Sequence, residues 1–261
     1  LGSDEAESGA GYELGARARQ IRDGLLALER RATPADMLRI QLDDRALFLD
    51  RWRRLLLATL DEEALKNSPR RAELRRWAER WDGRAATGSV GYRIVREFRL
   101  QVQQATWQML LEALGAGGAD DGPPSQFEGP LWRMVTEQPE HLPAPSQPGW
   151  RDFLLSQADA TEVALRGACG PLARCTWGAQ NQVALRHPLS GAVPWLSRLI
   201  DLPVVAQPGD QDMPRVQMGS LLADVFGAEH PTRVAAREGV GRIEQEGRGV
   251  VLYLPPRGDL L

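Results

Sequence analysis

Apolar residues in the first part of the chain recur every three or four positions, which is the period of an α-helix. Between Tyr12 and Arg30 they fall at spacings of 4, 3, 4 and 3, and they therefore share one face of a predicted helix. The residues of this stripe are Leu14, Ala18, Ile21, Leu25 and Leu28.

Three further stripes of the same kind follow, so the first half of the chain is predicted to be a succession of amphipathic helices. Their inward positions are Phe48, Trp52, Leu55 and Thr59 or Leu60, then Leu74, Trp77 and Trp81, and then Ile94, Phe98, Val102, Ala105 and Met109.

Residues with known end preferences mark several of these helices. Thr33 and Ser68 each precede a proline, and a hydroxyl N-cap followed by proline in the first turn is a typical helix start. Asp36 lies in the first turn of the helix that Thr33 opens, where a carboxylate is favourable. Gly83 and Gly115 follow the last periodic residues and are predicted to end their helices.

The periodicity stops after this region. Residues 115–130 are rich in glycine and proline and are interpreted as a surface loop, with a domain boundary as the alternative. Helices are predicted again over Leu131–Glu137 and Arg151–Arg166.

After Gly170 the pattern favours strands and turns. Short apolar runs at Leu202–Val205 and Val250–Leu254 are bounded by proline and glycine, which suits short strands. No repeat of fixed period is visible, which argues against a helical solenoid. The sequence thus predicts an α+β protein with its helices first and its strands last.

Composition places the chain among ordinary globular proteins. It has 261 residues, a net charge of -3 and a hydrophobic fraction of 43%, which excludes disordered, collagen-like and disulfide-scaffold classes. No apolar run approaches the roughly 18 residues of a spanning helix, so no membrane association is predicted.

Arginine supplies nearly all of the positive charge, since Lys66 is the only lysine among 32 basic residues. Arginine binds phosphate well, which raises the question of nucleic-acid binding. Here the arginines alternate with acids and the net charge is negative, so a solvated helix surface is favoured and no nucleic-acid partner is predicted.

Searches for common catalytic motifs find little. There is no Walker loop, GxGxxG, HExxH or GxSxG sequence. His141, His187 and His230 are far apart, so none is assigned a metal or triad role. Asp43 and Asp44 are adjacent and would point in different directions on a helix, so they are interpreted as cap or surface acids.

The two cysteines are separated by five residues, in the stretch CGPLARC. This spacing is too wide for a CxxC redox pair and offers no second pair for zinc. A local disulfide between Cys169 and Cys175, as in an exported protein, and two free thiols both remain open.

Five stretches, in this order and spacing, resemble the penicillin acylase family of N-terminal-nucleophile hydrolases, specifically the later part of the large β chain. They are GYELGARARQI (11–21), ADMLRIQLDDRALFLDRWRRLLLATL (35–60), LRRWAERWDG (74–83), WGAQNQVALRHPLSGAVPWLSRLIDLP (177–203) and PGDQDMPRVQ (208–217).

The resemblance implies a fold and a domain organisation. The fold would be the αββα arrangement of this family, with a helix-rich lobe over about residues 12–166 followed by short strands and turns. Residues 1–217 would be a partial β-chain region. Residues 218–261 would form a divergent, truncated or frame-shifted tail, because the family's glycine-glutamine-serine-glycine motif is absent after residue 217.

The resemblance also implies a reaction. Family members are exported precursors that cleave themselves and expose a serine, whose own α-amino group takes the hydroxyl proton. The serine attacks an amide carbonyl, and an asparagine side chain and backbone N–H groups hold the oxyanion. The expected substrates are amides between an acyl group and an amine, such as a β-lactam side chain in antibiotic biosynthesis or an N-acyl-homoserine lactone.

Few of the family's functional residues can be carried over to this sequence. Leu1 is not a nucleophile, so the serine and the oxyanion asparagine are expected upstream of it. The family's active-site arginine corresponds to Arg17, four positions before Ile21, with a structural or surface arginine as the alternative. The complete enzyme is expected to hold a structural calcium. Its ligands are not assigned, although Asp4, Glu5 and Glu7 lie in the corresponding neighbourhood.

These expectations define the predicted role of the chain. It would be part of an amidohydrolase, and it would be inactive alone and hold no cofactor of its own. Its partners would be the α chain and the N-terminal part of the β chain of the same precursor. The location would be periplasmic or secreted. The alternative is a non-enzymatic helical interaction module.

Overall fold

The computed structural model describes residues 15–115, 122–140, 142, 149–184, 186, 190, 195, 197–210 and 212–213. Contacts divide the chain into two units, Leu1–Val216 and Gln217–Leu261, and all described residues belong to the first. Its elements are α2 (Ala16–Leu26), α3 (Pro34–Gln41), η1 (Leu47–Leu49), α4 (Asp50–Thr59), α5 (Glu62–Leu65), α6 (Pro69–Glu79), α7 (Val90–Ala113), η2 (Ser125–Phe127), α8 (Glu128–Glu137), α9 (Trp150–Cys169), η3 (Leu172–Arg174), α10 (Trp177–Gln180), β1 (Gln182–Val183), α12 (Ser197–Ile200) and β2 (Val205–Ala206).

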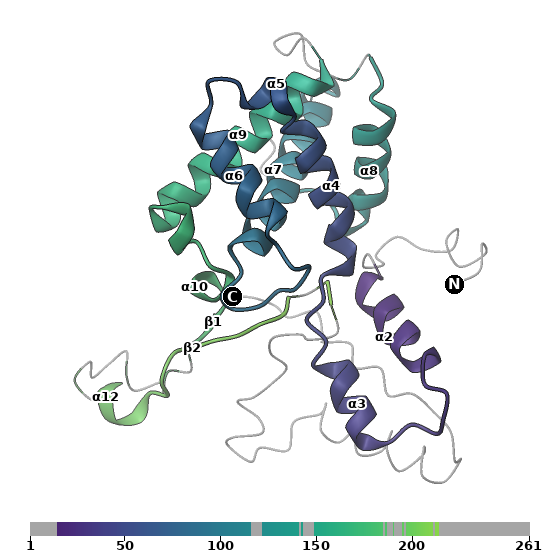
Figure 1. The fold of residues 1–261 in the computed structure, drawn as a ribbon, viewed down its shortest axis with the longest axis vertical. Coiled ribbons are helices and arrows are strands. Elements are labelled where there is room, and N and C mark those ends of the chain that lie inside the picture. Colours follow the sequence, from purple (N-terminus) through teal and green to yellow (C-terminus); the bar gives the residue numbers. More distant parts are fainter. Residues whose placement is uncertain are drawn as a thin grey trace. The chain divides into compact units, whose positions relative to one another are not determined.

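Helix α7 is the centre of the hydrophobic core, and α4, α6, α8 and α9 all pack against it (Figure 1). Ile94, Phe98 and Val102 of the predicted stripe are fully buried, while Ala105 and Met109 are partly buried against the same core. The predicted helix and its inward face are therefore confirmed.

Helices α6 and α7 meet at a position where only glycine fits. A Cβ atom added to Gly91 would lie 2.4 Å from Trp81 Cβ and 2.7 Å from the backbone oxygen of Trp77. Because Gly91 has no side chain, the first turn of α7 can approach the end of α6 this closely.

Most of the predicted helix ends are confirmed. Thr33 and Asp36 form a reciprocal capping box at the start of α3, with Pro34 in the first turn. Gly115, with a φ angle of 71°, directly follows the C-cap of α7 and ends that helix as predicted. The exception is Gly83, because α6 already ends at Glu79 and the prediction that Gly83 ends it was wrong. Helix α6 begins at Pro69 with Ser68 at its N-cap as predicted, although the Ser68 side chain makes no capping hydrogen bond.

The stripe predicted for the first helix is not a buried face. Helix α2 ends at Leu26, and Ile21 and Leu25 are only half-buried. The buried residue of α2 is instead Gln20. Helix α3 behaves similarly, since its Asp36 is buried while its apolar residues are exposed or half-buried.

The connection after α7 is shorter than predicted. Helix α8 begins at Glu128, within the stretch predicted as a loop to residue 130, because Phe127 packs in the hydrophobic core and the buried Glu128 accepts hydrogen bonds from Trp52 and Arg99. Helix α9 also begins and ends beyond the predicted Arg151–Arg166.

The region after Gly170 contains less strand than predicted. Short helical segments η3, α10 and α12 occupy much of it. In the described part of the chain the strands are β1 and β2, which pair antiparallel with Gln182 opposite Ala206 and Val183 opposite Val205. Only Val205 of the predicted Leu202–Val205 strand is in a strand, and Val250–Leu254 lies outside the described residues. The described chain is helix-rich with two short strands, which is compatible with the α+β class.

A disulfide joins Cys169, the last residue of α9, to Cys175. Of the two alternatives that the spacing left open, the structure contains the bonded one. Within the described ranges, no helix combines the length and apolar character needed to cross a membrane.

Candidate functional site

Parts of the five stretches that resemble the acylase family come together in a connected set of hydrogen bonds. We call this set the motif junction, and it consists of Gln20, Asp43–Ala46, Gly83–Ala85, Trp177–Asn181 and Gln207–Asp210. Each pair of neighbouring segments in it is joined by hydrogen bonds described below, although the segments are far apart in sequence.

Arg17, the candidate active-site arginine, is half-buried in the first turn of α2. Three residues later, Gln20 attaches this helix to the junction. Its Nε2 atom donates to Asp43 Oδ2 at 2.8 Å and to the Arg45 backbone oxygen at 3.0 Å. Both protons of the amide nitrogen are thus used.

Asp43 is held as a carboxylate by its surroundings. Burial acts most strongly and would raise its pKa, but hydrogen bonds from Arg45 and Gln20 together outweigh it and lower the pKa to about 2. The Arg45 guanidinium donates to Asp43 from Nε at 2.9 Å and from Nη2 at 2.6 Å. The acceptor for Gln20 is therefore charged and fixed in position at neutral pH.

The segment after Asp43 pairs with the chain beyond α6. The Ala46 amide donates to the Gly83 oxygen and the Ala85 amide donates to the Asp44 oxygen, both at 2.8 Å. Asp44 is 7% exposed and forms an ion pair with Arg84 at 2.5 Å. The interpretation of the two aspartates as cap or surface acids was wrong, because both accept hydrogen bonds or ion pairs that hold segments together.

The PGD turn closes the junction. The Gly209 amide donates to the Ala85 oxygen at 2.9 Å, and the Gly209 oxygen accepts from Trp177 Nε1 at 2.9 Å. Asn181 Nδ2 donates to the oxygens of Gln207 at 2.8 Å and Gly209 at 3.1 Å. Two stretches of the family resemblance, WGAQN and PGD, thus bind each other directly.

Asp210 anchors this turn to α7. Its Oδ2 atom accepts from the Tyr92 hydroxyl at 2.6 Å and from Arg96 Nε at 2.5 Å. Burial and the neighbouring Asp210 raise the pKa of Tyr92 far above its usual value, so the hydroxyl remains a donor. The Arg96 guanidinium also lies over the Trp177 ring, 5.2 Å from its centroid.

A second ionic group lies next to Asp210. Glu128 is 1% exposed and accepts from Arg51 Nη2 at 2.6 Å, Trp52 Nε1 at 2.8 Å and Arg99 Nε at 2.9 Å. Arg99 also contacts Asp212 at 3.5 Å. Burial raises the pKa of Asp212, and Arg99 only partly opposes this.

These carboxylates do not fit a calcium site. Within the described ranges, no group of three or more histidine, cysteine, aspartate or glutamate residues has an arrangement that could hold a metal ion. Glu128, Asp210 and Asp212 each contact an arginine, whose positive charge takes the place that a cation would need. The role of these three carboxylates is structural, because they accept hydrogen bonds or form ion pairs that hold helices and turns together.

Several sequence candidates cannot be placed. Leu1, the acids Asp4, Glu5 and Glu7, and all three histidines lie outside the described residues. The residues that sequence reasoning missed are Gln20, Tyr92, Arg96, Asp210 and the Glu128 group. The available signal was the spacing of Arg96 and Arg99 on the same helix as the buried apolar stripe, since an arginine close to the core favours an acidic partner.

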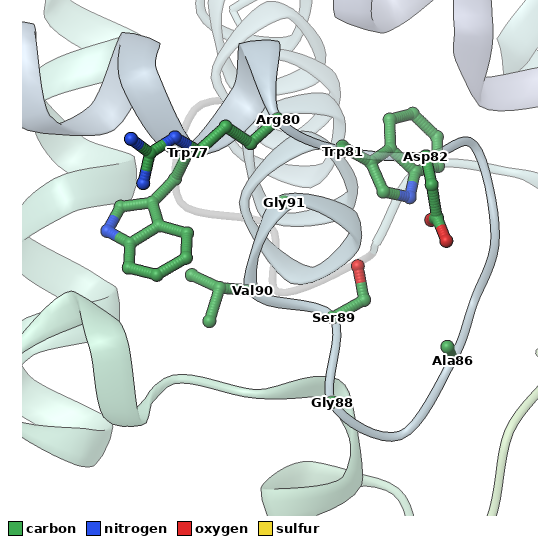
Figure 2. A pocket seen from close by; sticks show the side chains of 9 residues that line it. All are labelled: Trp77, Arg80, Trp81, Asp82, Ala86, Gly88, Ser89, Val90 and Gly91. Atoms are coloured by element: carbon green, nitrogen blue, oxygen red, sulfur yellow. The ribbon is translucent and has the colours of Figure 1, made fainter.

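A surface pocket of about 270 Å³ lies between the end of α6 and the start of α7. Figure 2 shows Gly91 between the side chains of Trp77 and Trp81, with Ser89 and Asp82 beside Trp81. Ser89 caps α7 and the Trp81 indole donates to the Arg84 oxygen, so these polar atoms already serve the fold. The pocket supplies no nucleophile and base in contact.

Comparison with known proteins gives one family. The family model described as "Penicillin amidase" matches residues 2–239, which includes the whole motif junction and most of the chain. A search of curated proteins finds no significant match. The match covers all five stretches that carried the resemblance, and the chain therefore belongs to the penicillin amidase family.

Proposed function

We propose that this chain is part of an amidohydrolase that cleaves the bond between an acyl group and an amine. Membership of the penicillin amidase family implies hydrolase activity in the complete enzyme. The observation that carries the proposal to this chain is the motif junction, because it attaches the helix of Arg17 to the other family-like stretches through Gln20.

The chain's own contribution is to place Arg17. In the proposed reaction, a serine supplied by sequence outside this chain attacks the amide carbonyl, and its α-amino group accepts the hydroxyl proton. A guanidinium can orient and stabilise charge that develops around such a nucleophile, and it does so best when its position is fixed beforehand. Helix α2 and the junction provide that fixation.

The surroundings of this chain are part of the proposal. Residues 1–217 form a partial β-chain region that works with the α chain and the preceding part of the β chain, in the periplasm or outside the cell. In support, β1 and β2 are two residues long each, and a two-stranded ribbon of this kind is marginal without further strands. Val204 and Val205 are about half exposed, at 55% and 48%, and they therefore offer apolar surface against which further strands could pack.

The substrate is proposed as an acyl amide, of the β-lactam side-chain or N-acyl-homoserine lactone type. The test compares the purified 261-residue chain with the complete polypeptide encoded around it, using phenylacetyl and long-chain acyl amides. We expect turnover only by the complete polypeptide. Turnover by the 261 residues alone would contradict the proposal that the nucleophile lies elsewhere, and no turnover by the complete polypeptide with either substrate would contradict the amidase function.

The alternative, a non-enzymatic interaction module, is favoured by one observation. Leu26, Leu38 and Leu42 of the α2–α3 region are 76%, 54% and 45% exposed. If these residues bind another protein instead of supporting catalysis, replacing Leu38 and Leu42 with serine would abolish complex formation while the complete polypeptide showed no hydrolysis.

A further inference from the structure

We propose that Gln20 is the positioning residue for Arg17: its side-chain amide fixes the face of α2 that carries the arginine. This inference rests on the proposed function, in which Arg17 acts at the amidase centre. The two residues are three positions apart on one helix and are therefore neighbours on its surface.

Among the described elements, helix α2 packs mainly against α3. It has 11 residues, and an isolated helix of this length is marginal in water. Gly15 at its N-cap makes no side-chain capping bond, and no acidic residue lies in its first turn. Gln20 is its buried residue, so the rotation of the helix about its axis depends on that side chain.

Contact with α3 does not replace this attachment. Gly24 of α2 packs against Ile40, whose Cγ1 atom would lie 3.2 Å from an added Cβ. Ile40 is only half-buried, and Met37 and Leu38 on the same helix are exposed. Helix α3 also continues into the junction, since the Asp43 amide donates to the Ile40 oxygen at 3.1 Å, whereas Gln20 attaches α2 directly to the Asp43 carboxylate and the Arg45 oxygen.

The far side of the Gln20 contact is held by ionic and backbone contacts. Asp43 binds Arg45, and the backbone on both sides of Arg45 pairs with Gly83 and Ala85. Ala85 in turn accepts from Gly209. A donor on Gln20 thus connects Arg17 to a network whose geometry is set by backbone pairing.

The chemistry of Gln20 matters, because both of its contacts are acceptors. Methionine has nearly the same length and shape as glutamine but no donor, so Gln20→Met removes only the hydrogen bonds. Lysine keeps donors at a similar reach, so Gln20→Lys should restore the contact with Asp43 and the Arg45 oxygen. Arg19→Met is the matched control, since Arg19 is exposed on the same helix.

The first experiment measures amide hydrogen exchange in the purified chain. We expect Gln20→Met to accelerate exchange of the α2 amides at least tenfold while α7 amides stay within twofold of wild type. Gln20→Lys should return most of the protection and Arg19→Met should not change it. Equal exchange in Gln20→Met and Arg19→Met, or an equal acceleration in α7, would overturn the positioning role.

The second experiment uses the complete polypeptide and an acyl amide substrate. We expect Gln20→Met to lower kcat at least tenfold with KM within twofold, Gln20→Lys to recover part of the loss, and Arg19→Met to match wild type. A normal kcat in Gln20→Met would overturn the inference. If wild type itself is inactive, the proposed function fails, and the exchange measurements still decide whether Gln20 fixes α2.

Discussion

Glu128 brings a negative charge into the helical core, where two arginines and a tryptophan bind its carboxylate. A buried ion pair adds little over a well-packed apolar group, but removing one partner leaves the others without compensation. The residue is therefore intolerant of change whatever its net contribution to stability.

Glu128→Gln keeps the shape of the side chain and removes its charge, so the half-buried Arg51 loses its counter-charge and Arg99 keeps only its longer contact with Asp212. We expect the free energy of unfolding to fall by about 3 kcal/mol or more in urea titrations. Glu137→Gln on the same helix removes an exposed pair with Arg133 and should cost less than about 1 kcal/mol. Equal losses of unfolding free energy in the two variants would contradict the prediction that the buried carboxylate matters more for stability than the exposed one.

Asp212 and Asp43 should respond oppositely to pH. The pKa of Asp212 is raised by burial, so its contribution to stability is greatest below its unfolded value of about 3.9 and is lost as pH rises through the folded pKa. Asp212→Asn imitates the protonated form. We expect it to gain stability relative to wild type between pH 4.5 and pH 8.

Asp43→Asn is the matched control for that measurement. Because the pKa of Asp43 is lowered to about 2, the wild-type advantage is present above about pH 4 and is lost only as pH falls toward 2. Its difference from wild type should be nearly constant from pH 4.5 to pH 8. A constant difference for Asp212→Asn as well would contradict the raised pKa.

At the scale of elements, sequence reasoning succeeded where local chemistry decides. Thr33, Pro34 and Asp36 form their cap with one another, and the α7 stripe is buried because that helix has neighbours on several sides. Sequence reasoning failed where the structure of a segment depends on residues far away in the sequence. Nothing near Gln20 in the sequence indicates that its amide meets Asp43, and the two-residue strands exist only because residues 182–183 and 205–206 meet.

The α6–α7 contact gives a prediction about two glycines. Gly91→Ala would push Trp77 and Trp81 away from the first turn of α7. We expect the free energy of unfolding to fall by about 3 kcal/mol, at the upper end of overpacking effects. Gly167→Ala in α9 meets no atom within 4 Å and should instead stabilise by about 0.5–1 kcal/mol. Thermal unfolding of the two variants beside wild type tests both signs, and a neutral Gly91→Ala would contradict the close approach.

At the scale of the whole molecule, the disulfide ties the end of α9 to the segment that enters the motif junction at Trp177. It closes a loop with a sequence separation of 6, for which loop-closure entropy gives about 2 kcal/mol. We expect reduction, or replacement of both cysteines by serine, to lower the free energy of unfolding by about that amount. Chemical denaturation with and without reductant measures it, with the serine variant insensitive to reductant. A wild-type protein equally insensitive would contradict a bonded pair.

The order of synthesis has a consequence for the motif junction. Tyr92 and Asp210 bind each other across 118 positions, and Gly209 closes the set of pairings that begins at Gln20. At 5–20 residues per second, roughly 10–40 s separate the translation of Gln20 from that of Gly209. During this interval α2 has been made while the turn that completes its support has not, so the surroundings of Arg17 become fixed late, after the whole helix-rich lobe has been synthesised.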